Sequence, residues 1–181
     1  MPLNLRKSTS LLSLGAALVL PAMPAMAEAD LADIGTTEVT CTGGAYQTWE
    51  PGLQLWLQPV AYTNKTSYDT CTSSDPNITS GELLVAAEVK SSCVGLQGST
   101  EATLTWNDGS VSTVALFRSG VDYVHGAQAY VSIGWVVDGP FQGDAAVMMS
   151  SITPNDLTPC LSPSGLTGLS GPSSLRLIRH Y

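Results

Sequence analysis

The chain offers few side chains that could act as a catalytic base, because it contains only two histidines, His125 and His180. His125 shares its parity with Tyr123 and Ala127 in an alternating segment, which favours a place in a sheet over the role of a general base. His180 lies near the end of the sequence, where chains commonly fray. No serine stands in the G-x-S-x-G pattern of a hydrolase nucleophile. We therefore expect no catalytic residues and no enzymatic activity.

Oxygen ligands gather in one stretch, residues 69–82, which contains Asp69, Asp75, Asn77 and Glu82. Such ligands on a loop suit Ca²⁺, although the stretch lacks the spacing of an EF-hand. The run Asp75-Pro76-Asn77 is also ordinary turn chemistry, so calcium binding by this loop stays an open question. The sequence has no Cys-x-x-Cys pair, which makes zinc binding improbable. We assign no metal site and no cofactor.

The four cysteines, at positions 41, 71, 93 and 160, form an even set. In an oxidising compartment an even set predicts two disulfides, and four cysteines allow three connectivities. We favour Cys41–Cys71 and Cys93–Cys160, because the segment between Cys41 and Cys71 reads as two strands that fold back and bring its ends together. The other two connectivities remain open at this point.

The best candidate for ligand binding is Trp56, which alternation places between Gln54 and Gln58 on a polar strand face. On that reading the leucines at positions 53, 55 and 57 point inward. An aromatic ring stacks on a sugar while flanking amides form hydrogen bonds with it. The alternative is that a neighbouring strand or the N-terminal arm covers Trp56.

Residues 1–27 have the pattern of a secretory signal peptide: a basic start, the apolar run LLSLGAALVL, and Ala25-Met26-Ala27 before a cleavage point. We expect a secreted protein, soluble after cleavage near Ala27. No later segment approaches the length of about 20 apolar residues that membrane insertion requires. Without the leader the chain would keep five basic side chains against fifteen acidic ones, which argues against nucleic-acid binding.

Beyond residue 38 the apolar residues recur with period two, and turn residues punctuate the chain, which predicts strands rather than helices. Asn107-Asp108-Gly109 is the strongest hairpin signal. Residues 121–137 read as one long strand, and Trp135 is expected in the core, as is Trp106. Residues 158–173 read as a loop held by Cys160. We predict a flexible acidic arm over residues 28–37. We then expect one antiparallel β-sandwich of eight or nine strands over residues 38–181, Ig-like or jelly-roll-like.

The order of several landmarks is similar to that of a group of small secreted actinobacterial proteins of uncharacterised function. This resemblance implies a disulfide-bonded β-fold and export, and it implies no activity. The landmarks that carry it cover most of residues 40–178. They are Cys41, Pro51-Gly52-Leu53, Tyr68-x-x-Cys71, Ser92-Cys93, Trp106-x-Asp108-Gly109, Gly139-x-Phe141-x-Gly143, and Cys160 ahead of Gly165-Leu166.

The sequence thus predicts a non-enzymatic extracellular binding module for a glycan or a protein. The alternative is a secreted inhibitor or interaction protein directed at an extracellular enzyme, which would use a disulfide-held loop such as residues 72–82 or 158–173. Nothing in the sequence indicates the oligomeric state or the identity of the ligand.

Overall fold

The structure is a computed structural model that describes residues 35–124 and 127–180. The predicted signal peptide, residues 28–34 of the predicted arm, and His125 lie outside the described residues. The last two residues assigned to that arm, Thr36 and Thr37, belong instead to the first strand.

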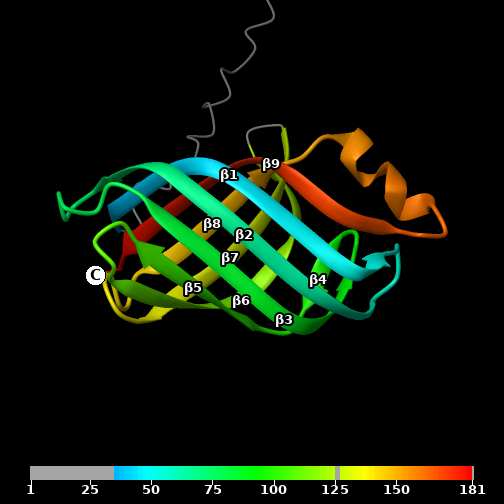
Figure 1. The fold of residues 1–181 in the computed structure, drawn as a ribbon, viewed down its shortest axis with the longest axis horizontal. Coiled ribbons are helices and arrows are strands. Elements are labelled where there is room, and N and C mark those ends of the chain that lie inside the picture. The colour runs from blue at the N-terminus through cyan, green and yellow to red at the C-terminus, as the bar shows by residue number, and fades with distance from the viewer. Residues whose placement is uncertain (1–34, 125–126, 181) are drawn as a thin grey trace, which may run out of the picture. The chain divides into compact units, whose positions relative to one another are not determined.

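Nine strands and one short 3₁₀ helix make up the described part of the chain (Figure 1). Their residue types explain the choice of strands, because Val, Thr, Tyr, Trp and Ile alternate with polar residues along most of them. The elements are β1 (Thr36–Leu53), β2 (Gln58–Ser73), β3 (Gly81–Ser92), β4 (Gly95–Gln97), β5 (Thr100–Trp106), β6 (Val111–Val124), β7 (Ala127–Asp138), β8 (Ala145–Ser151), η2 (Pro154–Leu161) and β9 (Leu166–Arg179).

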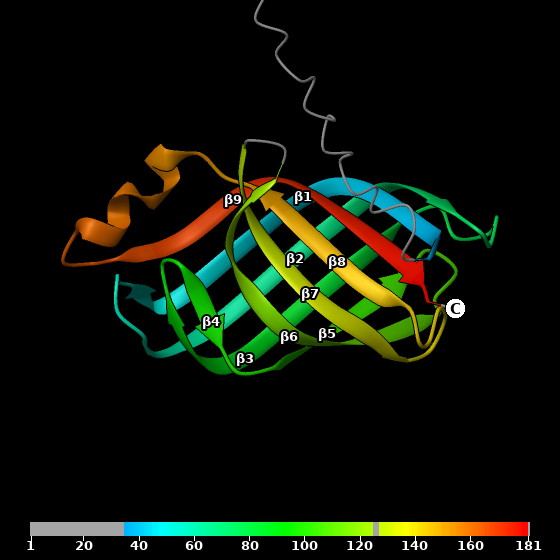
Figure 2. The same cartoon turned by 180° about the vertical axis from the view of Figure 1, so that it is seen from behind.

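The sheet closes on itself, so the predicted sandwich is wrong and the architecture is an antiparallel barrel. Each of β1, β2, β3, β5, β6, β7, β8 and β9 pairs with its neighbours, and β9 returns to pair with β1 (Figures 1 and 2). The closing ladder runs from Thr36↔Arg179 to Leu53↔Leu166. Periodicity shows which face of each strand is apolar, but it does not show whether the last strand pairs with the first.

The barrel wall has one discontinuity, because β4 and β5 share a single position between β3 and β6. The β3–β4 ladder covers residues 90–92 of β3, and the β3–β5 ladder covers residues 81–84. The intervening residues 85–89 are paired only on the β2 side. The two short strands separate at Gly98, whose φ of 103° suits glycine.

Both predicted disulfides are present, and they brace opposite ends of the barrel. Cys41–Cys71 joins β1 to β2, and Cys93–Cys160 joins the β3–β4 turn to η2. The chain turns sharply between β5 and β6 as predicted, with Gly109 at a φ of 85°. The apolar core lies inside the barrel between these ends and includes Val39, Val60, Leu83, Val85, Leu104, Trp106, Val114, Leu175 and Leu177.

The prediction of one strand over residues 121–137 is wrong, because the chain reverses between Val124 and Ala127, which pair with each other. That pairing also places Val121 opposite Tyr130. Odd-numbered positions at the end of β6 therefore lie on the same face of the sheet as even-numbered positions of β7. The side chains of β7 that point into the barrel are consequently the even-numbered ones. Trp135 consequently faces outward with 41% of its surface exposed, so its predicted place in the core is also wrong.

The predicted loop over residues 158–173 is wrong in part. Its first residues complete η2, which begins after Thr153 and ends at Leu161, and β9 already begins at Leu166.

Within the described ranges, no helical segment has both the length and the hydrophobicity of a membrane span.

Candidate functional site

The sequence candidate Trp56 lies in the turn between β1 and β2 and not on a strand face. β1 ends at Leu53, which is buried, and β2 begins at Gln58, so residues 54–57 form the connection. Leu55 and Leu57 are both exposed, which contradicts the prediction that three leucines point inward. Alternation holds only while the backbone stays in the ladder, and β1 already ends at Leu53, before the leucines at positions 55 and 57.

Hydrogen bonds and a disulfide brace this turn from both sides. The Cys93 backbone N–H donates to the Gln54 carbonyl over 2.8 Å, and Cys93 is bonded to Cys160. The Gln54 side-chain amide donates to the carbonyls of Ser162 and Pro163, each over 3.3 Å. These contacts join the β1–β2 turn, the β3–β4 turn and the end of η2.

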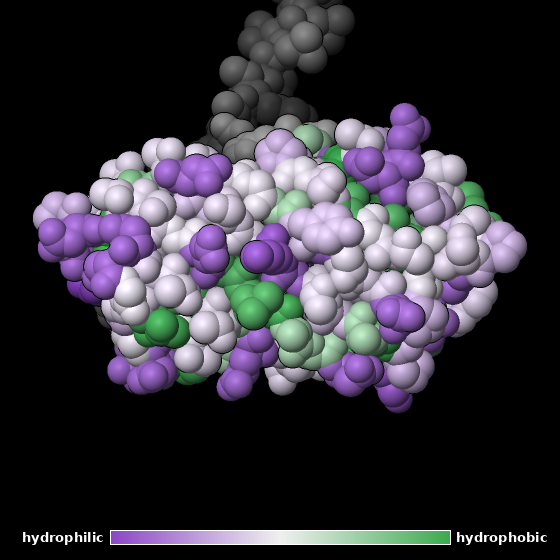
Figure 3. All heavy atoms as spheres, in the orientation of Figure 1, coloured by the Kyte–Doolittle hydropathy of each residue, from purple (hydrophilic) through white to green (hydrophobic). Residues whose placement is uncertain are grey.

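Five large apolar side chains stand exposed around this brace. We call them the apolar tip: Leu55, Trp56, Leu57, Val94 and Leu161. Trp56 is 63% exposed and Leu161 is 75% exposed. Adjacent exposed apolar residues on a braced turn are the usual mark of a binding surface rather than of a core. On the molecular face drawn in Figure 3, a green apolar patch lies near the centre and smaller ones are scattered among more polar residues.

The two glutamines beside Trp56 serve the turn itself. Besides the Gln54 contacts, the Gln58 amide donates to the Gly52 carbonyl over 2.7 Å. The N–H groups that were predicted to hold a sugar therefore already bind backbone oxygens. The structure keeps the three residues together but gives the amides a positioning role.

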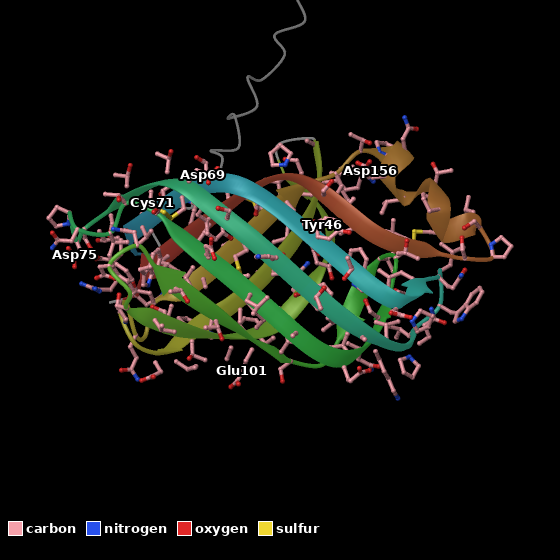
Figure 4. All side chains as sticks on the ribbon, viewed as in Figure 1. Tyr46, Asp69, Cys71, Asp75, Glu101 and Asp156 are labelled. Atoms are coloured by element: carbon pink, nitrogen blue, oxygen red, sulfur yellow. A yellow bond between two sulfur atoms is a disulfide. The ribbon has the colours of Figure 1, made fainter. Side chains whose placement is uncertain are left out.

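The calcium candidates lie near the opposite end, and only two of the four, Asp69 and Glu82, line the same groove. The Asp75 carboxylate accepts from the backbone and side chain of Asn77, over 2.9 and 3.1 Å, as in an Asx turn. Figure 4 shows Asp75 at the far end of the β2–β3 loop, well apart from Asp69 on β2. No group of three or more His, Cys, Asp or Glu side chains within the described ranges could hold a metal ion.

A shallow groove of about 410 Å³ lies near these residues, between β2, β3 and β5. The outward side chains along it are Ser67, Asp69, Glu82 and Thr105. The Ser67 hydroxyl donates to Asp69 over 3.1 Å. The groove thus carries two carboxylates, Asp69 and Glu82, and the hydroxyls of Ser67 and Thr105, and no histidine stands among its lining residues.

Sequence reasoning missed a polar cluster inside the barrel. The Tyr62 phenol donates to Gln47 Oε1 over 3.2 Å, and Gln47 Nε2 donates to Ser150 Oγ over 3.4 Å. Ser150 in turn donates to Ser173 over 3.4 Å. These four side chains are buried. Alternation could have located these residues, because each lies two positions from an apolar residue that points into the barrel. Tyr62, for example, lies two residues after the buried Val60.

Burial raises the pKa of three phenols in this interior, Tyr62, Tyr68 and Tyr130. For Tyr62 the neighbouring phenols of Tyr130 and Tyr68 raise the pKa further, and a hydrogen bond with Asn64 lowers it. The three phenols are therefore neutral at ordinary pH.

His180, the described member of the two histidines, packs its ring against Trp135 at a centroid distance of 5.3 Å.

No protein-family model, curated protein or solved structure matches this chain. The resemblance to small secreted actinobacterial proteins and the absence of enzymatic activity thus stay predictions.

Proposed function

We propose that this chain is a non-catalytic extracellular binding protein that contacts its partner through the apolar tip. One observation carries the proposal: Leu55, Trp56 and Leu57 are consecutive and each is more than half exposed. Exposing them costs free energy in the isolated protein, and covering them with a partner would recover it. The bracing of the turn lowers the entropy lost on binding, because the side chains are already positioned.

A protein partner is favoured over a glycan. The ring of Trp56 is flanked by leucines instead of free amides, and the Gln54 and Gln58 N–H groups bind carbonyls of the chain itself. A surface tryptophan among aliphatic side chains, which the partner covers on binding, is a common centre of protein–protein contacts. A sugar would require directional hydrogen bonds that these amides do not offer.

Inhibition of an extracellular enzyme is a second candidate, favoured by Leu161. This side chain follows Cys160 directly and is the most exposed large apolar residue of the tip. An apolar side chain held on a disulfide-linked segment could enter a specificity pocket without ordering a loop.

The test compares the wild type with Trp56→Ala and with Trp135→Ala, which removes an exposed tryptophan elsewhere. Each protein is immobilised and exposed separately to extracellular proteins and to insoluble cell-wall polysaccharide from the producing culture. We expect wild type and Trp135→Ala to retain the same proteins and Trp56→Ala to lose them. Retention by polysaccharide alone would reject a protein partner, and equal retention by all three would reject the apolar tip.

The inhibitor candidate has a separate measurement. Two variants are assayed with the wild type against a panel of secreted proteases. One is Leu161→Asp, and its matched control is Leu84→Asp, which changes an exposed leucine on β3, outside the apolar tip. Inhibition by wild type and Leu84→Asp that Leu161→Asp lacks would support it. No inhibition by the wild type would reject it.

A further inference from the structure

Two buried donors inside the barrel lack a hydrogen-bond partner among the described residues: Trp49 Nε1 and the Tyr130 hydroxyl. Their residues are 3% and 5% exposed. Leaving a buried polar group unpaired destabilises the folded state, and native structures rarely tolerate it without a reason. Two such donors in one barrel indicate that something else accepts from them.

Both donors adjoin the same residue, Tyr62. The Trp49 ring stacks on the Tyr62 ring at 5.8 Å with an interplanar angle of 15°. The Tyr130 phenol is close enough to Tyr62 to act on it electrostatically. Tyr62 also begins the polar series that continues through Gln47 to Ser150. The unpaired donors therefore border a polar region and are not isolated in hydrocarbon.

The interior beside Tyr62 is not completely sealed. Ala87 and Val89 alternate with the buried Leu83 and Val85 on β3, so they face inward, yet both are only half-buried. Ala87 pairs directly with Tyr62. This is the stretch of β3 where the wall is paired on one side only, next to the break between β4 and β5. Small molecules could reach the polar region there.

We propose that the interior of this barrel binds a small uncharged molecule whose oxygen atoms accept hydrogen bonds from Trp49 and Tyr130. An acceptor is required because an indole N–H can only donate. The ligand is uncharged because the surrounding polar groups, Tyr62, Gln47 and Ser150, are neutral, and an unpaired ion would pay a large desolvation penalty. The interior of an eight-stranded barrel is either filled by side chains or holds one small ligand. This site is independent of the apolar tip.

The probes are cyclohexanone and ε-caprolactam, which are neutral acceptors, with cyclohexanecarboxylate as the charged comparison. Binding is followed through the indole N–H resonance of Trp49 in ¹⁵N-labelled protein, assigned with Trp49→Phe. We expect the two neutral probes to shift this resonance, with a Kd of about 1 mM or tighter for at least one. The carboxylate should leave it unchanged.

Tyr130→Phe supplies the second arm, and Trp135→Ala, a change at an exposed tryptophan on the outer face, is the control. Tyr130→Phe should weaken probe binding about tenfold without lowering the melting temperature, because it removes an unpaired donor. Trp135→Ala should bind the probes as the wild type does. Failure of both neutral probes to move the Trp49 resonance would overturn the proposal. So would a lower melting temperature for Tyr130→Phe, because a permanent internal water would then already satisfy that hydroxyl.

Discussion

Cys93 and Cys160 are joined by a disulfide across 67 residues of sequence, and this bond places Val94 and Leu161 on the same braced end as the β1–β2 turn. The turn itself lies far from Cys160 in the chain, yet Gln54 contacts the residues that follow Cys160. The apolar tip is therefore assembled from three separate segments. Its integrity depends on this connection.

Removing this disulfide with Cys93→Ala/Cys160→Ala should lower the free energy of unfolding by about 4 kcal/mol, because the unfolded chain regains a long loop. The same change at Cys41 and Cys71, which are 30 residues apart, should cost slightly less. Urea unfolding of both double variants checks the order. A larger loss for the Cys41–Cys71 pair would contradict the chain-entropy explanation.

Trp106→Ala and Trp135→Ala should differ sharply in stability. Trp106 is buried, and its indole donates to Ser112 over 2.9 Å. Its removal leaves a cavity at a cost of about 3–5 kcal/mol, while the Ser112 hydroxyl keeps its hydrogen bond to the Pro140 carbonyl. Trp135 faces outward, so Trp135→Ala should lower the free energy of unfolding by less than about 1 kcal/mol. Thermal unfolding of both variants measures the difference. Equal losses would place Trp135 in the core after all.

The buried carboxyl of Asp144 should make stability depend on pH. Burial raises the pKa of this carboxyl above 3.8. The Arg179 guanidinium, whose Nε lies 3.5 Å from Asp144 Oδ1, partly offsets the rise, and the nearby carboxyl of Glu38 raises the pKa further. Because the folded pKa is the higher one, the stabilising contribution is complete below 3.8 and is lost as pH rises through the folded pKa.

Asp144→Asn keeps the site neutral at every pH. The free energy of unfolding of the wild type, relative to this variant, should therefore fall as the pH rises from about 4 to about 7. Urea titrations at several pH values within this window measure the difference. A constant difference, or a relative gain by the wild type as pH rises, would contradict the raised pKa.

The buried phenols should resist ionisation in alkali. Burial raises the pKa of Tyr62, Tyr68 and Tyr130 above 10.0, so stability is retained below that value and lost as the pH rises above it. We expect the tyrosinate absorbance of these residues to appear only together with unfolding measured by circular dichroism. Their ionisation in the folded protein would show that the interior admits bulk water.

Local features of the fold could be predicted because they depend on neighbouring residues. The alternation in β3 and β5, the turn at Asn107-Asp108-Gly109 and the inward position of Trp106 follow from side-chain parity and turn chemistry. The prediction failed where parity changes unseen. The reversal after Val124 exchanged odd and even positions in β7, and the early end of β1 exposed Leu55 and Leu57.

The sequence by itself determined the β character, the four cysteines with their favoured pairing, and Trp56 as a candidate contact. Only the tertiary structure decided that β9 pairs with β1, that the apolar tip joins three segments, and that the donors of Trp49 and Tyr130 are buried without a partner among the described residues. The physical reason is that periodicity records which side of a strand avoids water. Closure of a sheet and convergence of side chains depend instead on pairings between residues far apart in the chain.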